Sequence, residues 1–182
     1  TDESEVDGML AAAGKLESLA GREEQVRYLV RAKTVPISVP HPVNPLQEVR
    51  DALGLRNATT FTLSDHACAS GLLAVDVCGT LLAADGDPDA LALILLGEKT
   101  FTYMSRIIPD VTVLGEGVAA VLVAANGNRD RLLGYATRTH GSPEGTVIMG
   151  RDMAAEFRQI YAPALAEVIH EALAVAGLSI TD

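Results

Sequence analysis

Cysteine and basic residues are both scarce in this 182-residue chain, and each scarcity excludes a class of protein. The two cysteines, Cys68 and Cys78, fall in one expected helix, so they predict no disulfide framework and indicate a reducing compartment such as the cytoplasm. Only 14 Lys and Arg stand against 24 Asp and Glu, which gives a net charge of −10. Because nucleic-acid affinity depends mostly on basic contacts to phosphate, we expect no nucleic-acid partner.

Long hydrophobic runs are missing as well. The longest apolar stretch, 72–84, contains Asp76 and is shorter than the roughly 20 residues that cross a bilayer, so we expect no membrane partner. Residues 1–5 are acidic and lack the basic and apolar regions of a secretory signal. No histidine has the spacing of a metal site and no Gly-rich phosphate loop is present, so we expect neither a metal nor another cofactor.

What the chain does contain is a regular alternation of expected strands and helices. Hydrophobic residues make up 48% of it, enough for the sizeable core of one domain. Residue periodicity predicts strands at 25–35, 59–63, 91–96, 115–125 and 132–139. It predicts helices at 5–20, 45–53, 69–84 and 150–177, the last with Pro163 as a possible kink. This order favours an α/β fold with a mainly parallel sheet covered on both faces.

Two connections in this pattern carry local signals of their own. Asn44 is expected to cap the helix that begins at Pro45, since Asn is a good cap and Pro a good first residue. The segment 97–112 is expected to be a long functional loop with a helical turn.

The stretch FTLSDHACASGLLAV, residues 61–75, contains the strongest candidate for chemistry. Cys68 follows an expected strand and starts an expected helix, where the helix dipole favours a thiolate. The small residues 69–71 would let the backbone turn sharply and let a substrate carbonyl approach the amides. The alternative is that Cys68 simply packs in the core, as free cysteines often do. Cys78, in the middle of the helix, is expected to be a core residue.

The segment FTLSDHACASGLLAVDVCGTLLAADGDPDALALILLGE, followed about twenty residues later by LGEGVAAVLVAANG, is similar to β-ketoacyl-acyl-carrier-protein synthase III and its relatives. The resemblance runs from about residue 26 to 182 and is strongest over 59–126. It implies a thiolase-like fold, a mainly parallel mixed sheet with a buried helix after the nucleophile. It also implies that Cys68 is the acyl-accepting cysteine and that Gly115-Glu116-Gly117 is the family's Gly-acid-Gly turn.

The function implied by this resemblance is acyl transfer. Cys68 would take an acyl group from a thioester, and the acyl-cysteine would condense with a malonyl-type extender, as in fatty acid and polyketide biosynthesis. Some relatives instead pass the acyl group to a hydroxyl or an amine. A further alternative is a non-catalytic ketosynthase partner subunit, although such partners usually lack the nucleophile.

The resemblance also implies partners. The acyl donor would be an acyl carrier protein or a coenzyme A thioester, and the strand 59–63 would pair across a two-fold axis in a homodimer. Members that use coenzyme A commonly have an Arg in the loop before the Gly-acid-Gly turn and a Trp near the N-terminus. Here residues 107–110 read Ile-Ile-Pro-Asp and the chain has no Trp, which favours the carrier protein.

The chain also departs from the family pattern in its length. Members are about twice as long, and their catalytic His and Asn lie in a second half that is not identifiable here. We therefore predict that residues 1–149 are the half with the nucleophile and that 150–182 resemble the start of the second half. The sequence is expected to be a fragment or one piece of a split enzyme.

Two histidines are candidates for substrate binding. His66, two residues before Cys68, could tune the thiolate or could form hydrogen bonds in a buried interface. His140 falls where the family has a loop lining the substrate passage, although an ordinary exposed loop residue is the alternative. His41 lies in a Pro-rich connection that in the family is near the subunit interface, and His170 is expected to be solvated.

Overall fold

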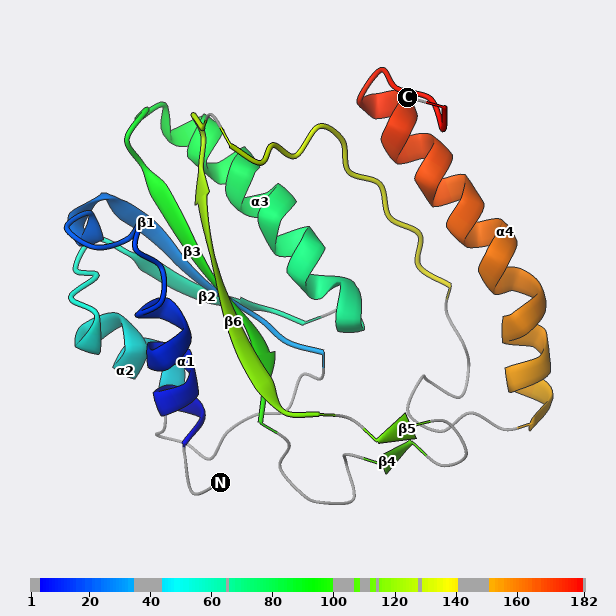
Figure 1. Cartoon of the computed structure of the whole chain (residues 1–182), viewed down its shortest axis with the longest axis horizontal. Helices are drawn as coiled ribbons and strands as arrows, with labels where there is room; N and C mark the ends of the chain where they lie inside the picture. Colours follow the sequence, from blue (N-terminus) through cyan, green and yellow to red (C-terminus); the bar gives the residue numbers. More distant parts are fainter. Residues whose placement is uncertain are drawn as a thin grey trace. The chain divides into compact units, whose positions relative to one another are not determined.

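A four-stranded mixed sheet organises the first of two compact units, Thr1–Asn128, in this computed structural model (Figure 1). The structure describes residues 4–34, 44–64, 66–99, 107–108, 112–113, 115–127, 129–140 and 151–181. The strands of the sheet are β1 (Val26–Ala32), β2 (Thr59–Leu63), β3 (Leu91–Glu98) and β6 (Gly117–Ala124), in the order β2-β1-β3-β6. β1 pairs in parallel with both β2 and β3, and β6 runs antiparallel to β3. The predicted mainly parallel, mixed sheet is confirmed.

Helices cover both faces of this sheet. α1 (Glu5–Ala13) and α2 (Pro45–Ala52) lie on one face and α3 (Ser70–Asp85) on the other (Figure 1). Asn44 caps α2 as predicted, because its side chain accepts a hydrogen bond from the Gln47 amide at 3.1 Å. The prediction that the first helix reaches residue 20 is wrong. α1 ends at Ala13 with Gly14 as its cap, and Leu19 is buried from a turn.

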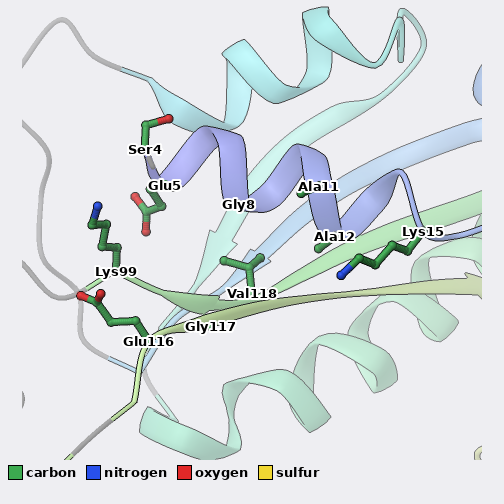
Figure 2. A pocket seen from close by; sticks show the side chains of 10 residues that line it. All are labelled: Ser4, Glu5, Gly8, Ala11, Ala12, Lys15, Lys99, Glu116, Gly117 and Val118. Atoms are coloured by element: carbon green, nitrogen blue, oxygen red, sulfur yellow. The ribbon is translucent and has the colours of Figure 1, made fainter. Parts of the chain in front are cut away.

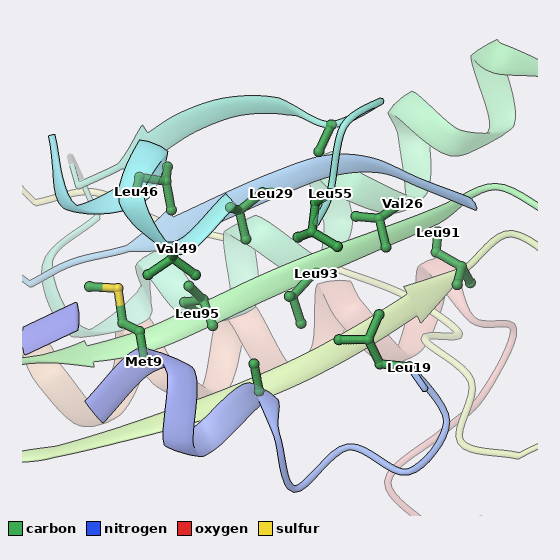
Figure 3. Close-up of a cluster of buried hydrophobic side chains, with 12 residues drawn as sticks. Met9, Leu19, Val26, Leu29, Leu46, Val49, Leu55, Leu91, Leu93 and Leu95 are labelled. Carbon is green, nitrogen blue, oxygen red and sulfur yellow. The ribbon is translucent and has the colours of Figure 1, made fainter. Parts of the chain in front are cut away.

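The core consists of two layers with different side chains. On the α1 and α2 face, large residues fill the space between helices and sheet (Figure 3); they include Met9, Leu46, Val49, Leu29, Leu93 and Leu95. Each fully buried side chain of this size contributes about 1.5–3 kcal/mol. On the other face, α3 packs through Ala74, Cys78 and Leu82, every fourth residue. This stripe is therefore the contact between α3 and the sheet.

The segment 67–85, which includes α3, is long and apolar enough to cross a membrane by length and composition alone. Core helices of soluble proteins meet the same criterion, and α3 contributes its buried stripe to the sheet. The expected absence of a membrane partner stays a prediction.

The second compact unit, Arg129–Asp182, contains α4 (Arg151–Val175), which continues through Pro163 as the predicted long helix. The predicted strand at 132–139 is wrong, because residues 131–140 have no regular secondary structure. This segment lies against α4: Arg138 forms a 3.0 Å ion pair with Glu171, and a Cβ on Gly134 would lie 2.4 Å from the Ala172 carbonyl oxygen. A helix uses its backbone groups internally, so it offers no edge with which a strand could pair.

The sequence boundary between the two compact units falls after Asn128, whereas the boundary predicted from the family resemblance falls after residue 149. That boundary concerns correspondence with the two halves of the family, and it stays a prediction. In the long connection after β3, β4 (Ile107–Ile108) and β5 (Thr112–Val113) form an antiparallel pair. The helical turn expected in this connection lies outside the described residues.

Candidate active site

Cys68 lies in a tight turn between the end of β2 and the start of α3. The turn contains a 3₁₀ helix, Ala67–Ala69, in which the Ala69 amide donates to the His66 carbonyl at 2.9 Å. The Ser70 amide donates to the Ala67 carbonyl, which leads directly into α3. Cys68 is a free, exposed thiol at the N-terminal end of a 16-residue helix. The structure thus confirms the position expected for it, after a strand and before a helix.

The backbone of this turn is strained immediately before the cysteine. Ala67 has a φ of +46°, and it is the one non-glycine residue with positive φ among the described parts of the chain. A side chain in this region costs of order 1–3 kcal/mol and persists only where the surrounding structure holds it. Such strain is often found at functional sites.

Two polar atoms on the buried side of the turn have no hydrogen-bond partner among the described residues. They are the Ser70 hydroxyl oxygen, in a side chain with 0% exposure, and the Nδ1 atom of the half-buried His66. The next residue, Gly71, allows a close approach: a Cβ there would lie 2.6 Å from the Leu96 side chain of β3. The turn is therefore pressed against the end of the sheet, with Cys68 on its open side.

Cys78 has the opposite environment. It has 0% exposure in the α3 stripe, and burial raises the pKa of its thiol from 9.0 to about 11. A thiol that is buried and protonated is not a nucleophile at neutral pH. The structure confirms the prediction that Cys78 is a core residue.

Comparison with known proteins gives matches among solved structures alone. No family model matches the sequence, and no curated protein matches it. The 3-oxoacyl-[acyl-carrier-protein] synthase III of Aquifex aeolicus VF5 superposes with a TM-score of 0.76 at 17% identity, over 98% of this chain and 59% of its own. ChlB3, an acyltransferase, gives 0.75 at 20% identity, over 99% of this chain and 60% of its own. The chain has a thiolase-like fold.

A third solved structure agrees, the HMG synthase of the curacin biosynthetic pathway. It gives a TM-score of 0.68 at 18% identity over 98% of this chain and 44% of its own length. The thiolase-like fold class predicted from the sequence is confirmed. The chain spans about 60% or less of the length of these enzymes.

The other sequence candidates are distributed over this thiolase-like chain. His66 shares the turn of Cys68, so the structure brings these two residues together. His140 is exposed in the second unit, and its contact with substrate stays a prediction. His170 is exposed on α4, as expected, and His41 lies outside the described residues. In the described part of the chain no group of three or more His, Cys, Asp or Glu could hold a metal ion.

The Gly-acid-Gly turn, Gly115-Glu116-Gly117, leads into β6 as the family resemblance implies. Its last residue contacts Gly97 on β3, which has a φ of +98°. A Cβ on Gly97 would lie 2.1 Å from the Gly117 carbonyl oxygen, so glycine is required there. Sequence reasoning missed this role, although an isolated glycine in the apolar run LALILLGE is a known signal of an irregular strand.

A surface cavity of about 250 Å³ lies away from the cysteine (Figure 2). Its lining includes Gly8 and Ala12 of α1, Lys15 just beyond α1, and Gly117 and Val118 of β6. The cavity is thus on the α1 face of the sheet, whereas α3, the helix that follows Cys68, lies on the opposite face (Figure 2). It does not form part of the candidate active site.

Proposed function

We propose that Cys68 is the nucleophile of an acyltransferase of the ketosynthase III type. The observation that carries the proposal is an exposed thiol in a strained turn, at the N-terminus of the helix that packs on the sheet of a thiolase-like fold.

In the first step the Cys68 thiolate attacks the carbonyl carbon of an acyl thioester. The new S–C bond gives a tetrahedral oxyanion, which collapses with loss of the donor thiolate and leaves acyl-Cys68. The donor thiolate takes a proton from solvent. No oxidant or reductant is needed.

Backbone amides of the turn are candidates for holding the oxyanion. The amides of Ala69 and Ser70 already donate to carbonyl oxygens of His66 and Ala67. We therefore assign the role to the amide of Cys68 itself, at the end of the turn where the helix dipole is positive.

In the second step the acyl group leaves Cys68. The first alternative is attack by the carbanion of a malonyl-type extender, which gives a new C–C bond. The second is attack by a hydroxyl or amine of a small molecule. Solved neighbours of both kinds, a synthase and an acyltransferase, fit the chain with TM-scores of 0.76 and 0.75, so the fold favours neither alternative. A non-catalytic partner subunit is disfavoured by the exposed cysteine.

The acyl donor is proposed to be carried by an acyl carrier protein. The HMG synthase of the curacin pathway was solved in complex with its holo donor carrier protein, with a TM-score of 0.63 to this chain. The absence of Trp argues against adenine binding in the style of the family members that use coenzyme A.

Acylation is tested by incubating the 182-residue chain with an acyl carrier protein thioester and, separately, with the same acyl group on coenzyme A. The acyl mass should appear on the peptide that contains Cys68, faster from the carrier protein. Cys68→Ala should abolish labelling, and Cys78→Ala should leave it intact. Label on Cys78, or equal label in the Cys68→Ala variant, would contradict the proposal.

Adding a malonyl thioester or a hydroxyl or amine acceptor to the acylated protein distinguishes the two second steps. A C–C bonded product with release of carbon dioxide identifies condensation, whereas an ester or amide identifies simple transfer. The 182-residue chain alone should keep the label, because the family's catalytic His and Asn lie in a second half that is not identifiable here. If neither acceptor removes the label when that second half is also present, Cys68 only accepts acyl groups and the catalytic proposal fails.

A homodimer is the proposed assembly. β2 lies at the edge of the sheet, next to β1 alone in the described strand order, and an edge strand can pair with its copy across a two-fold axis. Sedimentation of the complete protein at micromolar concentration should give twice its monomer mass. A monomer at that concentration contradicts this assembly.

A further inference from the structure

Ser70 is an unexpected residue at the start of α3. It begins the stripe Ser70, Ala74, Cys78 and Leu82, the four buried residues of the helix, and it is the one with a hydroxyl. Its exposure is 0%, and its Oγ has no hydrogen-bond partner among the described residues. Buried polar groups in folded proteins are nearly always hydrogen-bonded, so this hydroxyl needs an explanation.

His66 has a similar atom, because its Nδ1 is also buried and also lacks a hydrogen-bond partner among the described residues. His66 and Ser70 are four residues apart, and the hydrogen bonds from Ala69 to His66 and from Ser70 to Ala67 wind the chain between them into a tight turn. Four residues of such a helix span about 6–8 Å along the axis. Cys68, midway between them in the sequence, is exposed, whereas both polar atoms are buried.

We propose that His66 and Ser70 together bind one water molecule behind Cys68, and that this water fixes the imidazole as the tautomer with its proton on Nε2. One water can join two polar atoms that are about 5.5 Å apart. Buried waters typically bind groups that the protein leaves unpaired. The Ser70 hydroxyl donates to the water, and the water donates to the unprotonated Nδ1 of His66.

The consequence for the site is that Nε2 becomes a fixed hydrogen-bond donor. A donor two residues from Cys68 can stabilise its thiolate or the oxygen of the bound acyl group. Ser70 is then a positioning residue that acts through His66. This use rests on the proposed role of Cys68 as the nucleophile, but the water site and the tautomer do not require it.

The tautomer is measured on the 182-residue chain by ¹H–¹⁵N correlation spectra of the histidine rings, with a His66→Asn variant to assign the signal. We expect His66 to be predominantly the Nε2-protonated form in the native protein. Ser70→Ala should convert it to a mixture, and Ser70→Thr, which keeps the hydroxyl, should restore it. Thr80→Ala removes an exposed hydroxyl from the same helix and is the matched control, with no expected change.

Two further readouts separate this role from simple packing. Ser70→Ala should slow alkylation of Cys68 by iodoacetamide about fivefold, the factor that one ordinary hydrogen bond contributes. It should also lower Tm by about 3 °C, because a bound water loses a partner. In a His66→Phe variant, adding Ser70→Ala should no longer slow alkylation or lower Tm, since the two residues act as a unit.

Two other outcomes would contradict the water site and the proposed function, respectively. If the Ser70 hydroxyl were simply unpaired, Ser70→Ala would raise Tm and leave the His66 tautomer unchanged, and the proposal would be overturned. Failure of acyl labelling at Cys68 with an intact tautomer result would instead contradict the proposed function and leave the water site standing.

Discussion

The N-terminal turn and the centre of α3 each contain a cysteine, and their environments are opposite. At the turn, Cys68 is exposed and follows a strained alanine, and the turn holds two buried polar atoms that lack a partner among the described residues. At the centre, Cys78 is fully buried among apolar neighbours, and its pKa is raised to about 11. The centre of α3 therefore keeps the Cys78 thiol buried and protonated, whereas the turn before α3 leaves the Cys68 thiol exposed.

This difference shows that the centre of α3 fixes the helix on the sheet, whereas the turn before the helix holds the candidate active site. The central stripe is built from small apolar residues that pack on the sheet, and it gives α3 a fixed position. The turn contains a feature that lowers stability, the positive φ of Ala67. A site can hold such features only where a rigid element supports it.

The largest expected effect is the difference in thiol reactivity. With a pKa of about 11, only about one Cys78 thiol in a thousand is ionised at pH 8, and burial limits access further. Iodoacetamide should therefore alkylate Cys68 at least about a hundredfold faster than Cys78, as measured by mass spectrometry of the two peptides over time. In urea the two rates should become similar. Comparable rates in the native protein would show that the two environments do not differ as described.

The next effect is on stability at alkaline pH. The folded protein keeps the Cys78 proton between pH 9 and 11, whereas the unfolded chain loses it, so the free energy of unfolding falls as pH rises through this range. The contribution is fully present below pH 9 and amounts to about 2–3 kcal/mol. Urea unfolding at several pH values should show a steeper alkaline loss for the native chain than for Cys78→Ala.

The comparison with the variant is needed because Tyr28 titrates in the same direction. Its hydroxyl donates to Asp85 at 2.9 Å, and this hydrogen bond raises the pKa of Tyr28. The Tyr28 contribution is common to both proteins and cancels in the difference. Identical pH profiles for the two proteins would mean that Cys78 is not held protonated by the fold.

The smallest expected effect concerns two glycines of α3. A Cβ on Gly71, at the turn, would lie 2.6 Å from a Leu96 methyl, whereas a Cβ on Gly79, near the centre, would meet nothing within 4 Å. Gly71→Ala should leave Tm nearly unchanged, because the Leu96 methyl must shift and this small cost offsets the gain in helix propensity. Gly79→Ala should raise Tm by about 2 °C, since alanine favours a helix. Equal shifts in Tm from the two substitutions would show that Gly71 is no more tightly packed than Gly79.

Much of the fold follows from local sequence signals. Asn44 and Pro45 correctly predict the start of α2, and the run at 59–63 correctly predicts both ends of β2. The error at α1 has a physical reason. Leu16 and Leu19 continue the apolar spacing of a helix, but spacing reports burial, and Gly14 ends the helix while both leucines still pack on the core.

The predicted strand at 132–139 failed for a different reason. A strand is defined by the partner with which it pairs, and the local sequence does not contain that information. Similar reasoning applies to the site. Cys68 is found from its strand, small residues and helix, but the positive φ of Ala67 and the burial of the Ser70 hydroxyl depend on how the turn meets the sheet.

The strand order β2-β1-β3-β6 affects how the protein is made. β1 is central in the sheet, yet it is synthesised before both of its neighbours, and β3 is complete only when the ribosome reaches Glu98. At about 5–20 residues per second, several seconds separate β1 from the end of β3. During that interval the two edges of β1 and its apolar residues Leu29 and Val30 are open to other chains. We therefore expect the nascent chain to bind chaperones through β1, and protection to arrive only as β3 is released from the exit tunnel.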